Sequence, residues 1–129
     1  MEPFIYDLHV HTSDVSPCGH VSAQDVVKLY KDAGYHGVVI TDHYAAEIFA
    51  RFAHLSWAEQ VEQYLAGYYS ALRVGEQVGL DVFLGMEIRF TESPNDYLVY
   101  GITPEFLVNY PELYHLGLAG FRRLIKGKE

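Results

Sequence analysis

The chain has 129 residues, half of them hydrophobic and a fifth charged, which is typical of a single globular domain spanning residues 1–129. Nine Lys and Arg residues against seventeen Asp and Glu residues give a formal net charge of −8. This charge argues against a long nucleic acid as partner, because such binding needs cations that displace phosphate counterions. No run of about 18 apolar residues is present, so we expect no membrane span. The one cysteine, Cys18, cannot form an internal disulfide, which favours a reducing cytoplasm.

Strand-like apolar runs alternate with helical stripes along the chain. In chain order, we expect strands at residues 4–11, 37–41, 82–90 and 96–102, helices at residues 22–33 and 56–78, and one or two helical segments after Pro104. Helices between the first three strands favour a parallel sheet with helices on its outside, because such crossovers are right-handed. We therefore expect an α/β fold that bends toward an open or closed barrel.

Four side chains that can bind a metal lie near the ends of the predicted strands. His9 and His11 close the first strand, His43 follows the second, and Glu87 lies near the end of the third. In parallel α/β sheets, the carboxyl ends of neighbouring strands meet at one edge. We therefore expect three histidines and one carboxylate in the same small volume.

The spacing of His9 and His11 has a direct physical reason. Residues two apart on a strand point the same way, so both imidazoles can reach one cation. Neutral imidazole suits Zn, Mn and Fe, and a carboxylate such as Glu87 can bridge two cations. A histidine ligand also needs a hydrogen bond on its other ring nitrogen, and Asp7 and Asp42 are candidates for that role. The sequence thus predicts a divalent metal site.

Each of these residues also has an ordinary structural explanation. A His-x-His pair can arise by coincidence, and residues 41–43 can simply cap the segment that follows. Glu87 can pair with Arg89 at the surface. Arg89 shares a strand face with Glu87, so it is a candidate contact for a phosphate, with an ion pair as the alternative. The joint placement at three strand ends favours the metal site.

Three segments resemble the motifs of the PHP (polymerase and histidinol phosphatase) domain family. Residues 7–12 (DLHVHT) are similar to its opening motif, residues 34–43 (GYHGVVITDH) to its second, and residues 85–88 (GMEI) to its third. The order, the spacing and the strand context agree, and the resemblance covers residues 4 to about 102.

The resemblance implies a distorted barrel of seven strands that holds two or three metal ions and hydrolyses phosphate esters. His9 and His11 would share one cation with Glu87, Glu87 would bridge to a second, and His43 would serve another. With about four strands and flanking helices, the chain would form a partial distorted (β/α)7 barrel. The implied substrate is a small phosphomonoester such as histidinol phosphate or a nucleotide.

The loop after His11 carries a further motif. Residues 16–20 (SPCGH) resemble the Cys-Gly-His segment of the histidinol-phosphatase branch, in which the histidine is a ligand. This likeness implies that His20 binds a metal. The loop is longer here than in that branch, so Asp14 and Cys18 are alternative ligands, and a free surface histidine is a further alternative.

The later motifs of the family do not occur after Glu87, so the resemblance implies a domain without the C-terminal part of the family fold. A half barrel exposes sheet edge and apolar surface, and we expect either a homo-oligomer that covers this surface or a chain of low stability. Two functions follow. One is a metal-dependent phosphoesterase acting on a small phosphorylated substrate, and the other is a noncatalytic metal-binding or interaction module. A third function, that of an amidohydrolase, is less consistent with Glu87 on the third strand and with residues 41–43 on the second.

Overall fold

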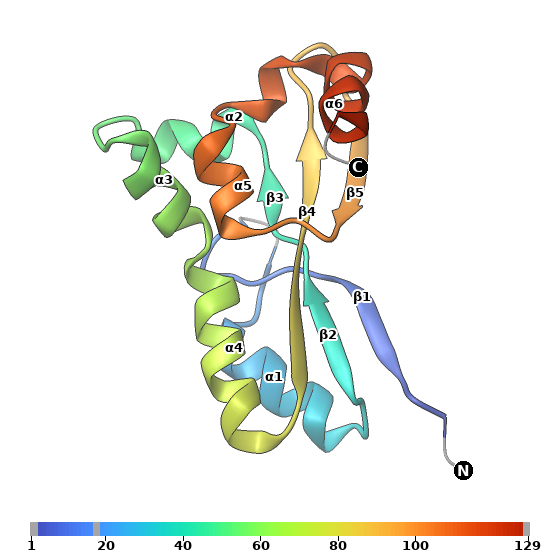
Figure 1. Cartoon of the computed structure of the whole chain (residues 1–129). Coiled ribbons are helices and arrows are strands. Elements are labelled where there is room, and N and C mark those ends of the chain that lie inside the picture. The colour runs from blue at the N-terminus through green and yellow to red at the C-terminus, as the bar shows by residue number, and fades with distance from the viewer. Residues whose placement is uncertain (1–2, 17–18, 128–129) are drawn as a thin grey trace.

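Four main strands form one curled sheet in the computed structural model, which describes residues 3–16 and 19–127 (Figure 1). Strands β1, β2 and β4 run parallel, and β5 runs antiparallel to β4. Their bounds are Tyr6–Val10 for β1, Gly37–Ile40 for β2, Asp81–Arg89 for β4 and Asp96–Tyr100 for β5. This half barrel with flanking helices confirms the predicted partial α/β barrel.

A two-residue strand, β3 (His43–Tyr44), continues the line of β2. Both strands pair with β4 in the same parallel register. The amide of Asp81 donates to the carbonyl of His36, and the amide of Glu87 donates to the carbonyl of Asp42. Residues six apart on a strand present their amides to the same edge. β2 and β3 therefore line one edge of β4, and β5 lines the other.

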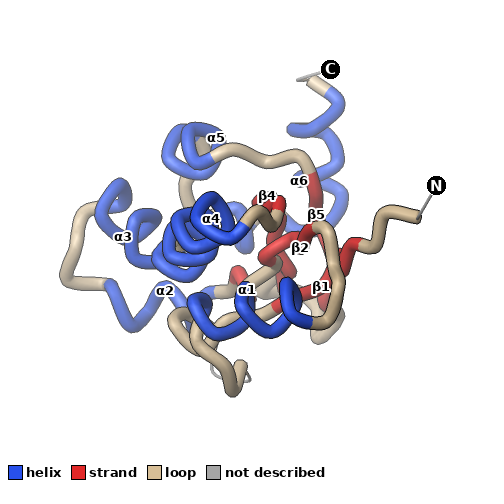
Figure 2. Tube along the Cα trace, turned by 90° about the horizontal axis from the view of Figure 1, so that it is seen from below, coloured by secondary structure: helices blue, strands red, loops and turns tan. Residues whose placement is uncertain are grey.

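Helices cover one face of this sheet. Every second residue of β4 from Val82 to Ile88 is buried in the two apolar clusters that the helices help to form, whereas Phe83 is half exposed on the opposite face. Helices α1 and α4 pack together on one side of the strands (Figure 2). The helical elements are α1 (Ala23–Asp32), α2 (Ala46–Phe49), α3 (Trp57–Tyr64), α4 (Ala66–Val78), α5 (Pro104–Asn109) and α6 (Gly117–Lys126), with short 3-10 turns η1 (Ala50–Phe52) and η2 (Leu113–His115).

The uncovered face of the sheet curls on itself. In a flat sheet of order β1-β2-β4-β5, the outer strands would lie about 14 Å apart. Here the hydroxyl of Tyr100 in β5 donates to the carbonyl of Leu8 in β1 at 2.8 Å. A tyrosine side chain is too short to span a flat sheet of this width, so the bond shows how strongly the sheet is bent.

Apolar side chains line the open face, and Leu8, Phe83 and Tyr100 are about half exposed there. The self-association expected over such a surface stays a prediction. No helix in the described part of the chain combines the length and the apolar character needed to cross a membrane.

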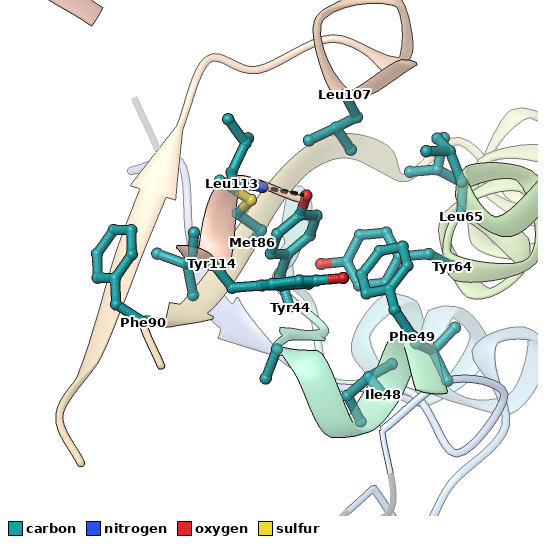
Figure 3. Packing of buried hydrophobic residues seen from close by; sticks show 14 of the residues in the cluster. Tyr44, Ile48, Phe49, Tyr64, Leu65, Met86, Phe90, Leu107, Leu113 and Tyr114 are labelled. Atoms are coloured by element: carbon teal, nitrogen blue, oxygen red, sulfur yellow. Dashed lines mark hydrogen bonds between the residues drawn. The ribbon is translucent and has the colours of Figure 1, made fainter. Parts of the chain in front are cut away.

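Tyr44 is the centre of the larger apolar cluster and is fully buried (Figure 3). Its ring centroid lies 4.8 Å from that of Phe49, 5.4 Å from that of Tyr64 and 5.6 Å from that of Tyr114. Its hydroxyl accepts a hydrogen bond from the amide of Leu113 at 3.2 Å. Aromatic packing of this kind joins β3, which begins with the metal-capable His43, to helical segments from both halves of the chain.

The long helix expected at residues 56–78 is wrong in one respect, because the chain divides it into α3 and α4. Ser56 caps α3 through reciprocal hydrogen bonds with Glu59. The break falls at the buried Leu65. Immediately after it, a Cβ built on Gly67 would lie 2.2 Å from the hydroxyl of Thr12 and 2.9 Å from a carboxylate oxygen of Asp42. The break thus lets α4 begin in direct contact with the loop after β1.

This close approach predicts that Gly67→Ala destabilises the protein even though alanine favours helices. A new methyl group at this position must displace Thr12 or the buried Asp42, and overpacking of this kind costs about 1–3 kcal/mol. Urea unfolding followed by circular dichroism measures the change. Gly120→Ala in α6 is the matched control. The nearest atom to a Cβ at this position is the Leu116 Cβ at 3.3 Å, and the next lies 3.8 Å away. An equal effect of both substitutions would contradict the packing explanation.

Candidate metal centre

Three histidines surround the carboxylate of Glu87. His9 Nε2 contacts Glu87 Oε1, and His11 Nε2 lies 3.4 Å from the same oxygen. On the other side, His43 Nδ1 lies 3.0 Å from Glu87 Oε2. The imidazole centroids of His9 and His11 are 5.0 Å apart, and those of His11 and His43 are 4.4 Å apart. The structure therefore brings the four side chains into one volume.

A bulge in β1 brings the two histidines of this strand to the open face. Asp7 and Val10, which are three residues apart in β1, pair with Val38 and Ile40, which are only two residues apart in β2. The extra residue places Val10 in the apolar cluster beneath the helices and leaves His9 and His11 facing Glu87. A regular strand would place Asp7 on the same face as His9 and His11, but the bulge places it on the opposite face.

Asp7 also differs from its expected role beside an imidazole. Its Oδ2 accepts a hydrogen bond from the Tyr30 hydroxyl at 2.5 Å, and its Oδ1 accepts one from the backbone amide of His9 at 3.0 Å. Burial is the largest cause of the raised pKa of Tyr30, followed by the hydrogen bond to Asp7. Asp7 thus fixes the backbone of the bulge and ties it to α1.

His43 and Glu87 are direct neighbours in adjacent strands. They are register partners in the pairing of β3 with β4, so their side chains leave the sheet on the same face. Glu87 lies near the end of β4, two residues before its last residue, Arg89. The side-chain exposures are 50% for His9, 18% for His11, 22% for His43 and 8% for Glu87, so the site opens to solvent on the His9 side.

His11 is held in the form that binds metals. Burial lowers the pKa of His11, and the neighbouring imidazole of His43 lowers it further, against the opposing charges of Glu87 and Asp42. A lowered pKa favours the neutral imidazole, whose free ring nitrogen is the donor that a cation needs.

The donor set fits divalent cations at two positions. His9, His11 and Glu87 offer ligand atoms within 4.8 Å of one another, and so do His43, Glu87 and Asp96. Imidazole nitrogen combined with carboxylate oxygen suits Zn, Mn or Fe. Sequence reasoning missed Asp96. Only the register of β5 on β4, in which Asp96 lies opposite Arg89, reveals that this carboxylate shares the face of Glu87.

Asp42 acts on the site through the backbone. Its Oδ1 accepts hydrogen bonds from the Thr12 amide at 2.7 Å and the Ser16 hydroxyl at 2.9 Å, and its Oδ2 accepts one from the Thr12 hydroxyl at 2.9 Å. The Ser16 hydroxyl in turn accepts from the amide of His43 at 3.0 Å. Burial raises the pKa of Asp42, while the hydrogen bonds from Thr12 and Ser16 oppose the rise. These bonds hold the residues that follow His11 and precede His43.

The loop candidates lie in different surroundings. His20 is exposed and belongs to neither group of metal-capable side chains found among residues 3–16 and 19–127. The Oδ1 of Asp14 accepts from the amide of Ala23 at the start of α1. Cys18 lies outside the described residues. Which of the three binds a metal therefore stays a prediction.

Arg89 pairs with two carboxylates on the open face. Its Nε donates to Asp96 Oδ1 at 2.9 Å, its Nη2 donates to Asp96 Oδ2 at 3.0 Å, and its Nη1 lies 3.7 Å from Glu47 Oε1. The ion pair that was the alternative for this residue is thus present, with Asp96 and Glu47 as partners. A contact between Arg89 and a phosphate stays a prediction.

A model of the PHP domain family matches residues 7–127. The chain belongs to the PHP domain family. Among solved structures, the PHP domain is similar to a protein from Bifidobacterium adolescentis that is provisionally named as a metal-dependent phosphoesterase. The two are 25% identical, with a TM-score of 0.48, over 75% of this chain. The chain spans 27% of the length of that protein. No curated protein matches the sequence.

The hydrogen bonds of Asp42 in this PHP domain predict a strong effect of Asp42→Ala. Alanine removes the acceptor of three buried donors, so we expect the free energy of unfolding to fall by about 2–4 kcal/mol. Asp42→Asn is the matched control, because its side-chain oxygen can still accept from Thr12 and Ser16, and it should lose less than half as much. Urea unfolding of both variants tests this, and equal losses would contradict it.

Proposed function

We propose that this PHP domain hydrolyses a phosphate ester with divalent cations held by His9, His11, His43 and Glu87. The observation that carries the proposal is the convergence of three imidazoles on both oxygens of one buried carboxylate. A buried carboxylate that is surrounded by three imidazole rings is uncommon as a purely structural feature, and the Glu87 side chain is 8% exposed. Membership of the PHP family supports this interpretation.

Each ligand has a distinct part in the proposed site. The Oε1 of Glu87 faces His9 and His11, and its Oε2 faces His43, so the carboxylate can serve one cation with each oxygen. The bulge and Asp7 orient His9, while the Asp42 hydrogen bonds fix the strand ends that carry His11 and His43. A bound divalent cation supplies Lewis acidity toward the phosphoryl oxygens and lowers the pKa of a coordinated water to about 7. The half-exposed His9 marks the side from which substrate enters.

A small phosphorylated molecule is the proposed substrate. The net charge of −8 supports this over a long nucleic acid, because few cations are available to follow a phosphate backbone. Histidinol phosphate would fit the likeness of residues 16–20 to the histidinol-phosphatase branch, and a nucleotide is compatible with the breadth of the PHP family. Zn, Mn and Fe are all compatible with the donor set, and a third cation would require a loop ligand such as His20. The single cysteine supports a cytoplasmic location.

The test combines metal content with turnover. Purified protein should contain at least one equivalent of Zn, Mn or Fe, or take it up on titration, and should hydrolyse p-nitrophenyl phosphate in proportion to bound metal. The double substitution His9→Ala, His11→Ala removes two ligands of one cation and should lower both metal content and kcat/KM by about 100-fold or more. Elemental analysis and a colorimetric assay measure the two quantities.

His54→Ala is the matched control, since His54 is exposed and lies outside both groups of metal-capable side chains in the described parts of the chain. It should change neither metal content nor turnover. Bound metal without turnover at any loading would instead favour the noncatalytic metal-binding module. Absence of metal uptake would show that the cluster is structural.

A further inference from the structure

Three carboxylates and one guanidinium meet on the open face beside His43. Arg89 binds both oxygens of Asp96 through a two-pronged contact, and Glu47 lies 3.7 Å away on its other side. Glu87, two residues earlier on β4, lies on the same face of the strand as Arg89. Arg89 is therefore the counter-cation of this carboxylate group.

The same Asp96 carboxylate is also within reach of a metal ion. Its oxygen lies within 4.8 Å of the ligand atoms of both His43 and Glu87, a separation that one cation can bridge. However, the fork of Arg89 occupies both Asp96 oxygens at 2.9 and 3.0 Å. A cation that binds Asp96 must therefore share this carboxylate with a guanidinium or displace it.

We propose that His43, Glu87 and Asp96 form a second cation position and that Arg89 competes with the cation for Asp96. This inference rests on the proposed metal site at Glu87. When Arg89 holds Asp96, it neutralises one of the carboxylates and keeps the pairing of β4 with β5 intact. When a divalent cation takes Asp96, the guanidinium turns toward Glu47, its remaining partner on the surface.

The charges decide the direction of the effect. Glu47, Glu87 and Asp96 together carry three negative charges, and Arg89 leaves a net charge of −2 that a divalent cation would balance. A fixed positive charge next to a cation position repels the ion, and it also occupies the oxygens that the ion needs. Arg89 should thus weaken the second position and leave the His9–His11 position, on the other side of Glu87, almost unaffected.

A different arrangement would give the opposite result. If Arg89 served to orient Asp96 as a ligand, as partners of ligating carboxylates commonly do, its removal would weaken cation binding. Arg89 and Asp96 are also direct neighbours in the pairing of β4 with β5. If their ion pair only held these two strands together, removal of Arg89 would lower the stability of the protein and leave its metal affinity unchanged.

The experiment is calorimetric titration of the chelator-treated full chain with Mn²⁺ alone. The unaltered protein should show a tighter and a weaker binding event. Asp96→Asn should abolish the weaker event and retain the tighter one. Arg89→Gln should tighten the weaker event by about tenfold or more and change the tighter one by less than about threefold. Arg73→Gln, which makes the same change of net charge on α4, is the matched control and should alter neither event.

Arg89→Lys is a second variant in case Arg89→Gln does not fold, which circular dichroism would reveal. Lysine keeps the charge and cannot form the fork, so the weaker event should tighten by a smaller factor than with glutamine. A weaker event that is unchanged or weakened in both variants, or that is absent from all proteins, would overturn the proposal. If the affinities change as expected but the protein does not hydrolyse phosphate esters, the proposed function is wrong, whereas the competition between Arg89 and the cation for Asp96 still holds.

Discussion

The carboxylate of Asp42 connects the parts of the chain that build the site. The carboxylate accepts hydrogen bonds from the amide and hydroxyl of Thr12 and from the hydroxyl of Ser16. The backbone carbonyl of Asp42 accepts one from the amide of Glu87. Through these bonds, the end of β1, the break between β2 and β3, and the middle of β4 are fixed relative to one another. Because the group is almost fully buried, each missing partner would leave a desolvated donor, and the arrangement has few alternatives.

Helix α4 depends on the same group of atoms. Gly67 allows the first turn of α4 to touch Thr12 and Asp42, and the hydroxyl of Tyr64 just before it donates to the carbonyl of Asp42 at 2.7 Å. The helix break at Leu65, the buried Asp42 and the imidazole positions are thus parts of one packing arrangement. The metal-capable residues lie on the open face, and the bonds that hold them in place lie in the interior. This separation leaves the histidines accessible while their backbones are rigid.

Local patterns predicted the parts of the structure that local forces determine. Residues 23–32 form a helix because an apolar stripe follows the cap at Ser22, and residues 37–40 form a strand because three of the four are β-branched and all are buried. The convergence of His9, His11, His43 and Glu87 followed from the parallel sheet order, which helices between strands already indicate.

Features that depend on contacts distant in sequence could not be read in this way. The bulge in β1 places Asp7 on the same face as Val10, opposite to His9 and His11, and only pairing with β2 determines it. Asp96 joins the site because of the β4–β5 register. Residues 93–95 (SPN) between these strands indicate a turn, but they do not fix which residues of the two strands pair. The division of the long helix comes from the contact of Gly67 with Thr12, whereas the local pattern favours a continuous helix.

The bulge in β1 has a consequence for assembly. Among the described strands, β1 pairs only with β2, so its outer edge is a place where another chain could add a strand. A regular ladder requires an even spacing of amides and carbonyls, and the extra residue between Asp7 and Val10 interrupts it. The bulge that places His9 beside Glu87 therefore also makes this edge a poor template for cross-β stacking of further chains. One local distortion thus determines the ligand geometry and also opposes fibril growth.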